Sequence, residues 1–134
     1  SEEPSYNSLR NYLRLSKKSE CDIVLGIGGG SCMDVAKAVG GLLTNSGDPL
    51  DFRGFDKVII PGIPVYLAPT TAGTGSEASF NASLVDTDSN KKLGINGINM
   101  FARKSFLDGQ ATISCPRRPA VGASVDAIVH AMEG

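Results

Sequence analysis

The sequence has little of several residue types, and each shortage excludes a class of protein. Lys plus Arg (13) and Asp plus Glu (14) nearly balance, so there is no basic surplus to indicate a nucleic-acid partner. No apolar run approaches the ~20 residues of a membrane span, and the first residues show no signal-peptide pattern. The three cysteines, Cys21, Cys32 and Cys115, lack C-x-x-C spacing. They are expected to be free thiols in a reducing, cytoplasmic compartment.

Glycine, by contrast, is abundant, and its sixteen copies cluster in two loops. The first loop, Gly28-Gly29-Gly30-Ser31, follows an apolar run at 22–27 that is typical of a parallel strand buried on both faces. A helical period follows over 32–40. Backbone N–H groups that open a helix attract anions, and glycine lets a phosphate approach them closely. A tight turn without ligand is the alternative for this loop alone, which matches neither G-x-G-x-x-G nor a P-loop.

A second loop, Thr70 to Glu77, follows another apolar run at 64–68. It combines glycine with the hydroxyl groups of Thr70, Thr71, Thr74 and Ser76. Ligands of open α/β sheets bind at the carboxyl ends of the strands. Because both loops follow strands, the sequence predicts that they share one crevice.

Other segments complete the predicted fold. An amphipathic helix is expected over 5–18 with Ser5 as its N-cap. A β-hairpin is expected from 81–86 and 92–95, and a short strand over 105–107. A final helix is expected after Pro116, with Pro119 in its first turn. The alternation of strands and helices predicts an α/β sheet, and residues 50–62 are expected to be irregular.

Asp126 and His130 form a candidate metal-binding pair. Their i, i+4 spacing places them on one helix face, with Cβ atoms about 6 Å apart. Together they could hold a divalent cation, but a catalytic metal usually needs at least three protein ligands. The pair is therefore either half of a metal site or an ordinary histidine and carboxylate on a helix. A Ser-His-Asp triad is disfavoured, because Asp126 would lie beside His130 and residues 73–77 are not G-x-S-x-G.

Three segments together resemble the iron-containing (group III, metal-dependent) alcohol dehydrogenase family. Residues 28–37, GGGSCMDVAK, resemble its G-G-G-S-x-x-D-x-A-K segment. Residues 69–77, PTTAGTGSE, resemble P-T-T-[AS]-G-T-[GA]-[SA]-E, and residues 126–133, DAIVHAME, resemble D-A-x-x-H-A-x-E. The segments occur in the family's order, and the resemblance runs from about Ser5 to Gly134.

The resemblance implies an oxidoreductase that transfers hydride between NAD or NADP and a small alcohol, aldehyde or ketone. Residues 1–115 would be part of a Rossmann-like (dehydroquinate synthase-like) dinucleotide-binding domain, and residues 116–134 the first helix of an all-helical metal-binding domain. The metal, Fe²⁺ or alternatively Zn²⁺, would be bound by Asp126 and His130. Cofactor contacts carried over by position are Gly29, Gly30, Ser31, Thr70, Thr71, Thr74, Asn81 and Lys92.

The family also has two further histidine ligands and earlier strands that this sequence does not contain. The 134-residue chain alone is therefore expected to have little or no dehydrogenase activity. A sheet without those strands would expose an edge and an apolar face, so a homo-oligomer is among the expected partners. The alternatives are a zinc-dependent polyol dehydrogenase relative, a non-catalytic nucleotide- or sugar-phosphate-binding module, and a truncated paralogue that acts only in assembly.

Overall fold

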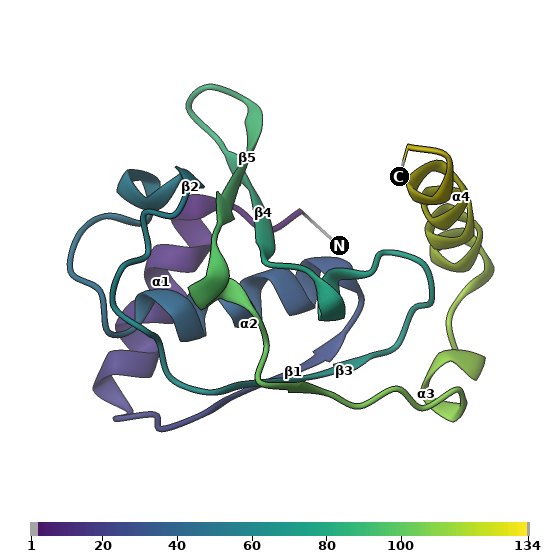
Figure 1. Cartoon of the computed structure of the whole chain (residues 1–134), viewed down its shortest axis with the longest axis horizontal. Helices are drawn as coiled ribbons and strands as arrows, with labels where there is room; N and C mark the ends of the chain where they lie inside the picture. Colours follow the sequence, from purple (N-terminus) through teal and green to yellow (C-terminus); the bar gives the residue numbers. More distant parts are fainter. Residues whose placement is uncertain (1–2, 134) are drawn as a thin grey trace.

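The computed structural model describes residues 3–133 and has the expected α/β architecture (Figure 1). Two small sheets lie on opposite sides of the central helix α2 (Gly30–Leu42). The first sheet is parallel and has the order β1-β3-β6, with β1 at Val24–Gly28, β3 at Val65–Pro69 and β6 at Lys104–Ser105. The second has the order β2-β5-β4, with β2 at Gly54–Phe55, β4 at Asn81–Asp86 and β5 at Lys91–Asn96.

Helix α1 (Tyr6–Lys18) confirms the predicted N-terminal helix and its cap. The Ser5 hydroxyl accepts a hydrogen bond from the backbone N–H of Ser8, and Ser8 bonds back to the Ser5 backbone, which forms a capping box. The apolar stripe of α1, which includes Leu9 and Leu13, packs against α2 and the hairpin. This packing forms the larger of two core clusters and holds α2 in place.

Close packing of α2 on the parallel sheet depends on Gly26. A Cβ at Gly26 would lie 2.7 Å from the Cβ of Ala36, so a larger residue would push α2 off the sheet. The opposite face of β1 is open, with Leu25 58% and Ile27 60% exposed. The prediction that this strand is buried on both faces is wrong for residues 3–133, because the helices of this part of the chain cover one face only.

Several local predictions also need correction. Helix α2 begins at Gly30 instead of residue 32. The region 50–62 contains a short helix, Pro49–Phe52, and strand β2, which pairs with β5. The last strand is Lys104–Ser105, which starts one residue and ends two residues earlier than expected, and it pairs with Tyr66 and Leu67 of β3. The short helices Ser76–Ala78, Ile98–Met100 and α3 (Gln110–Ile113) were not predicted.

The last helix, α4 (Arg117–Glu133), lies at the same end of the molecule as α3 and above it in the view of Figure 1. Of its described side chains, only Ala123 is buried. Its apolar residues, such as Val125, Ile128 and Met132, are exposed on several sides. Among the described residues, no helix is long and apolar enough to cross a membrane.

Candidate functional site

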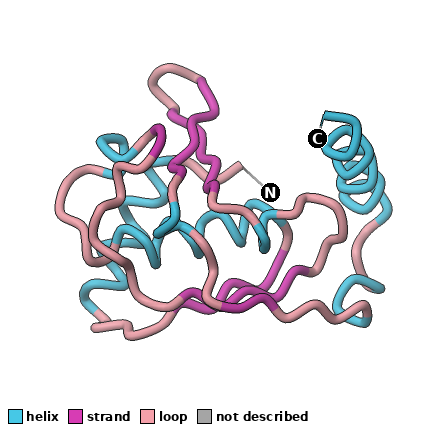
Figure 2. The backbone as a smooth tube through the Cα atoms, in the orientation of Figure 1, coloured by secondary structure: helices cyan, strands magenta, loops and turns pink. Residues whose placement is uncertain are grey.

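The two glycine-rich loops meet because their strands are neighbours in the sheet. Gly28 at the end of β1 pairs with Pro69 at the end of β3, and the Thr70 N–H donates to the Gly28 carbonyl at 2.9 Å. A Cβ on Gly29 would lie 3.3 Å from Thr71 Cγ2, and one on Gly30 would lie 3.0 Å from Thr74 Cγ2. Figure 2 shows the loop after β3 curving past the start of α2 toward α4.

A crevice lies over this junction and confirms the prediction that both loops share one. It comprises two adjoining depressions that have Gly30, Ser31, Thr74 and Asp126 in common. The other sequence-predicted residues that line it are Gly29, Thr71, Asn81, Lys92 and His130. Of the predicted cofactor-binding residues, Thr70 alone lines neither depression. Its backbone N–H instead connects the second loop to the first by donating to the Gly28 carbonyl.

The first turn of α2 supplies the crevice with free backbone donors. Gly29 is the N-cap residue, has an extended backbone, and makes no side-chain capping hydrogen bond. The N–H groups at this end therefore keep their partial positive charge and lie beside the Thr74 side chain. Such an arrangement binds phosphate, provided that no side chain fills the space above it.

Two buried polar atoms in this region have no hydrogen-bond partner among the described residues. They are Thr71 Oγ1 and Asn81 Oδ1, and both belong to residues that line the crevice. An unpaired buried polar atom costs about 1–3 kcal/mol. A ligand hydroxyl could donate to either atom if the side chain turned toward the crevice, whereas a phosphate oxygen, itself an acceptor, could pair only with the Thr71 hydroxyl.

Lys92 gives the crevice an accessible positive charge. Its Nζ lies 3.6 Å from Glu3 Oε1, but both side chains are more than half exposed. An exposed pair of this kind is worth little, so Lys92 can exchange Glu3 for an anionic ligand at small cost.

Asp34, in the wall of the crevice, forms an ion pair with Lys37, which is buried behind it, and sequence analysis did not identify this pair as functional. Lys37 Nζ lies 3.2 Å from Asp34 Oδ1, and the lysine is fully buried. Burial lowers the pKa of Lys37, while the neighbouring Asp34 carboxylate opposes that shift. The signal was present in the D-x-A-K spacing of residues 34–37, which places both side chains on one helix face.

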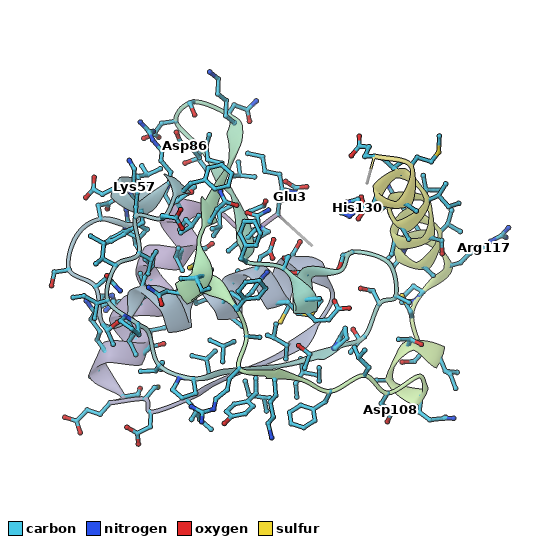
Figure 3. All side chains as sticks on the ribbon, viewed as in Figure 1. Glu3, Lys57, Asp86, Asp108, Arg117 and His130 are labelled. Atoms are coloured by element: carbon cyan, nitrogen blue, oxygen red, sulfur yellow. The ribbon has the colours of Figure 1, made fainter. Side chains whose placement is uncertain are left out.

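The predicted metal-binding pair lies at the crevice edge on α4. The distance from His130 Nε2 to Asp126 Oδ1 is 3.5 Å, and the two side chains are 59% and 47% exposed. Figure 3 shows His130 on the side of α4 that faces the hairpin. An imidazole nitrogen and a carboxylate oxygen suit Fe²⁺ or Zn²⁺. Within residues 3–133, however, no group of three His, Cys, Asp or Glu side chains could hold a metal.

Comparison with known proteins gives a consistent result. A sequence model described as iron-containing alcohol dehydrogenase matches residues 1–109. The chain is 40% identical over 132 residues to sulfoacetaldehyde reductase of Bilophila wadsworthia, covering 98% of this chain and 34% of that protein. It is 30% identical to the NAD-dependent methanol dehydrogenase of Bacillus methanolicus, again covering 98% and 34%. The chain thus spans about a third of the length of these relatives.

Solved structures agree with the sequence comparison. A 1,3-propanediol oxidoreductase superimposes with a TM-score of 0.91 at 29% identity, covering 98% of this chain and 35% of that one. Sulfoacetaldehyde reductase from Bifidobacterium kashiwanohense, solved in complex with NAD⁺, gives a TM-score of 0.90 at 29% identity and covers 99% and 36%.

Proposed function

Because this chain belongs to the iron-containing alcohol dehydrogenase family, we propose that it forms the cofactor-binding loops and half of the metal site of an NAD(P)-dependent oxidoreductase. The reaction is hydride transfer between the nicotinamide and a small alcohol or aldehyde. The observation that carries this proposal is the shared crevice. Both glycine loops and the Asp126–His130 pair contribute residues to its lining.

In this proposal the loops bind and orient the dinucleotide. The N-terminus of α2 at Gly29, Gly30 and Ser31 binds the pyrophosphate, since its N–H groups are free and the glycines leave room. Thr71 and Thr74 line the cofactor from the second loop, and the Thr70 backbone holds the two loops together. Asn81 and Lys92 contact the cofactor from the hairpin. Fixing the cofactor removes its translational freedom before hydride moves.

Asp126 and His130 would supply two ligands to the metal, Fe²⁺ or alternatively Zn²⁺. When bound, such a metal polarises the substrate oxygen as a Lewis acid. We propose residues 1–115 as the dinucleotide-binding part and residues 116–134 as the first helix of a helical metal-binding domain. On this basis, the 134-residue chain alone should have little or no dehydrogenase activity.

Cofactor binding can be tested by titrating ADP-ribose into the full-length polypeptide encoded by the gene, using calorimetry. Gly30→Val would place its branched side chain against Thr74, over the phosphate site, and should abolish binding. Gly109→Val is the matched control, because nothing lies within 4 Å of a Cβ at Gly109. Equal binding by wild type and Gly30→Val would refute the assignment of the loops.

For the substrate, we propose sulfoacetaldehyde as the first aldehyde to test. The support is the 40% identity to a sulfoacetaldehyde reductase over nearly the whole chain. NADH and NADPH oxidation should be measured with the full-length enzyme against sulfoacetaldehyde, 3-hydroxypropanal and formaldehyde. A kcat/KM for sulfoacetaldehyde no higher than for the two uncharged aldehydes would exclude this substrate while leaving the dehydrogenase proposal in place.

The second candidate is a non-catalytic nucleotide-binding module. The limit of two metal ligands within residues 3–133 favours it. Such a module would bind ADP-ribose with the same affinity in the presence of Fe²⁺, of Zn²⁺ or of a chelator, and would oxidise no alcohol. Metal-dependent turnover by the full-length polypeptide would exclude it.

A further inference from the structure

Lys37 is connected to the second glycine loop by an unusual number of hydrogen bonds. Its ammonium group donates to the Ser76 carbonyl at 2.8 Å, to Ser79 Oγ at 3.0 Å and to the Asn81 carbonyl. The Ser79 carbonyl also accepts, at 3.4 Å, so these four acceptors share the three N–H donors of the ammonium group with the Asp34 carboxylate. The acceptors span the segment that runs from the end of the second loop into β4.

Asp34 joins the same segment from the neighbouring turn of α2. Its Oδ1 accepts a hydrogen bond from Ser76 Oγ, and its Oδ2 accepts one from the Ser83 backbone N–H at 3.0 Å. The Asp34 side chain is only 16% exposed, and that exposed part faces the crevice beside Ser31 and Thr74. The pair therefore connects α2, the loop and the hairpin at one point.

We infer that Lys37 is a positioning residue for the cofactor site. Two consequences of its contacts support this role, which rests on the function proposed above. First, Lys37 fixes residues 76–81, and these connect Thr74 to Asn81, the two crevice residues contributed by this segment. Second, it neutralises the Asp34 carboxylate, which would otherwise place a negative charge beside a bound pyrophosphate.

In this role Lys37 does not contact the cofactor. Lys37 is 0% exposed and is separated from the crevice by Asp34 and the loop backbone. Its substitution should therefore affect cofactor affinity through the loop, by removing the donor from four carbonyl or hydroxyl oxygens. A purely structural role predicts a different result, namely that only folding stability changes.

Lys37→Met in the full-length polypeptide tests the inference, because methionine keeps the length and removes the donors and the charge. We expect its Kd for ADP-ribose to rise by about tenfold or more, as expected for losing a buried charged hydrogen-bond network. Leu9→Ala is the matched control. It also weakens the core, but Leu9 lies on α1 and does not line the crevice. Its Kd should stay within about twofold of wild type, since it leaves the loop contacts intact.

Asp34→Asn combined with Lys37→Met separates charge from positioning. Removing both members of a buried ion pair is often tolerated, so this double variant should regain stability relative to Lys37→Met. It should still bind ADP-ribose weakly, because the oxygens of Ser76, Ser79 and Asn81 remain without their donor. All binding is measured well below each variant's unfolding temperature.

Wild-type affinity in either Lys37→Met or the double variant would overturn the positioning role, and so would an equal loss in Leu9→Ala. Failure of the wild type itself to bind ADP-ribose would instead overturn the proposed function. The two failures are therefore distinguishable in one set of titrations.

Discussion

Gly73 of the second loop lies directly against Ala123 of α4. A Cβ on Gly73 would be 1.9 Å from the Ala123 carbonyl oxygen, and the Gly73 φ of +140° is one that other residues rarely adopt. This contact joins the loop that lines the crevice to the helix that carries Asp126 and His130. The spacing of the two parts of the site therefore depends on the absence of a side chain at one position.

Gly73→Ala should separate α4 from the loop and reduce catalysis. Relief of the clash requires backbone movement, at a cost of about 1–3 kcal/mol. We expect kcat of the full-length enzyme to fall more than ADP-ribose affinity, because the metal pair moves relative to the cofactor. Gly75→Ala is the control. It has φ +62° but no atom within 4 Å of its Cβ, so it tests backbone strain without the clash. Equal kcat values for the two variants would contradict the prediction.

Thr71→Val should weaken ADP-ribose binding without lowering folding stability. Valine has nearly the shape of threonine but lacks the hydroxyl, and Thr71 Oγ1 has no partner among the described residues. Removing an unpaired buried polar atom should leave the free energy of unfolding unchanged or raise it by about 1 kcal/mol. The Kd for ADP-ribose should rise by about three- to tenfold for a lost hydrogen bond. Urea unfolding and calorimetry measure the two effects, and a loss of stability without a change in Kd would contradict the assignment.

His130→Gln should remove metal without affecting the dinucleotide. The variant loses an imidazole ligand and should lower metal affinity of the full-length enzyme by at least about tenfold, since even losing a ligand's hydrogen-bond partner costs 10- to 100-fold. Metal content per polypeptide after loading with Fe²⁺ or Zn²⁺ is the measurement, and ADP-ribose affinity should not change. Glu133→Gln, three residues later on the same helix, is the matched control and should keep its metal.

Tyr6 should make the protein sensitive to alkaline pH. Burial raises the pKa of Tyr6 from 10.0 to about 12, and its hydroxyl donates to the Leu93 carbonyl at 3.1 Å. A raised folded-state pKa means that the unfolded chain loses its proton first. The contribution of protonated Tyr6 to the free energy of unfolding is complete below pH 10 and is lost as the pH rises from 10 to 12. We expect roughly 1–2 kcal/mol of lost stability, less than the full shift implies, because the hydrogen bond to the Leu93 carbonyl is only partly buried.

Tyr6→Phe should flatten this alkaline loss in urea unfolding followed by circular dichroism. At neutral pH the variant should be less stable by about 1 kcal/mol, the usual value of one hydrogen bond. Tyr12→Phe, on the more exposed side of the same helix, controls for loss of a phenol. An unchanged slope between pH 10 and pH 12 in Tyr6→Phe would contradict the burial argument.

Patterns that are local in the sequence predicted most of the site. Apolar runs followed by glycine-rich loops placed Gly29 and Thr71 just beyond strand ends, and the parallel order of β1 and β3 brought these ends together. The spacing of Asp126 and His130 predicted a shared helix face, and their side chains do lie 3.5 Å apart. In each case the determining feature lies within about ten residues of the chain.

Features that depend on distant pairing were missed. Strand β2 has two residues and forms only because Gly54 and Phe55 pair with Ile95 and Asn96, about forty positions later. Lys37 appeared to be a polar position on a helix, and its burial depends on acceptors at Ser76, Ser79 and Asn81. No single-sequence periodicity encodes the convergence of those oxygens. The exposed outer face of β1 likewise follows from which layers surround the sheet, and the sequence of the strand does not determine it.

The pairing of Gly28 with Pro69 also sets the position of one loop relative to the other along the strand direction. A slip of one residue between β1 and β3 would displace the loops by about 3.3 Å, roughly the length of a hydrogen bond. The free N–H groups at the start of α2 and the hydroxyls of the second loop would then no longer reach the same ligand. The register of β1 and β3, whose side chains do not line the crevice, thus sets the distance between the two loops. Substitutions deep in the sheet that change this register would therefore change the proposed cofactor affinity from a distance.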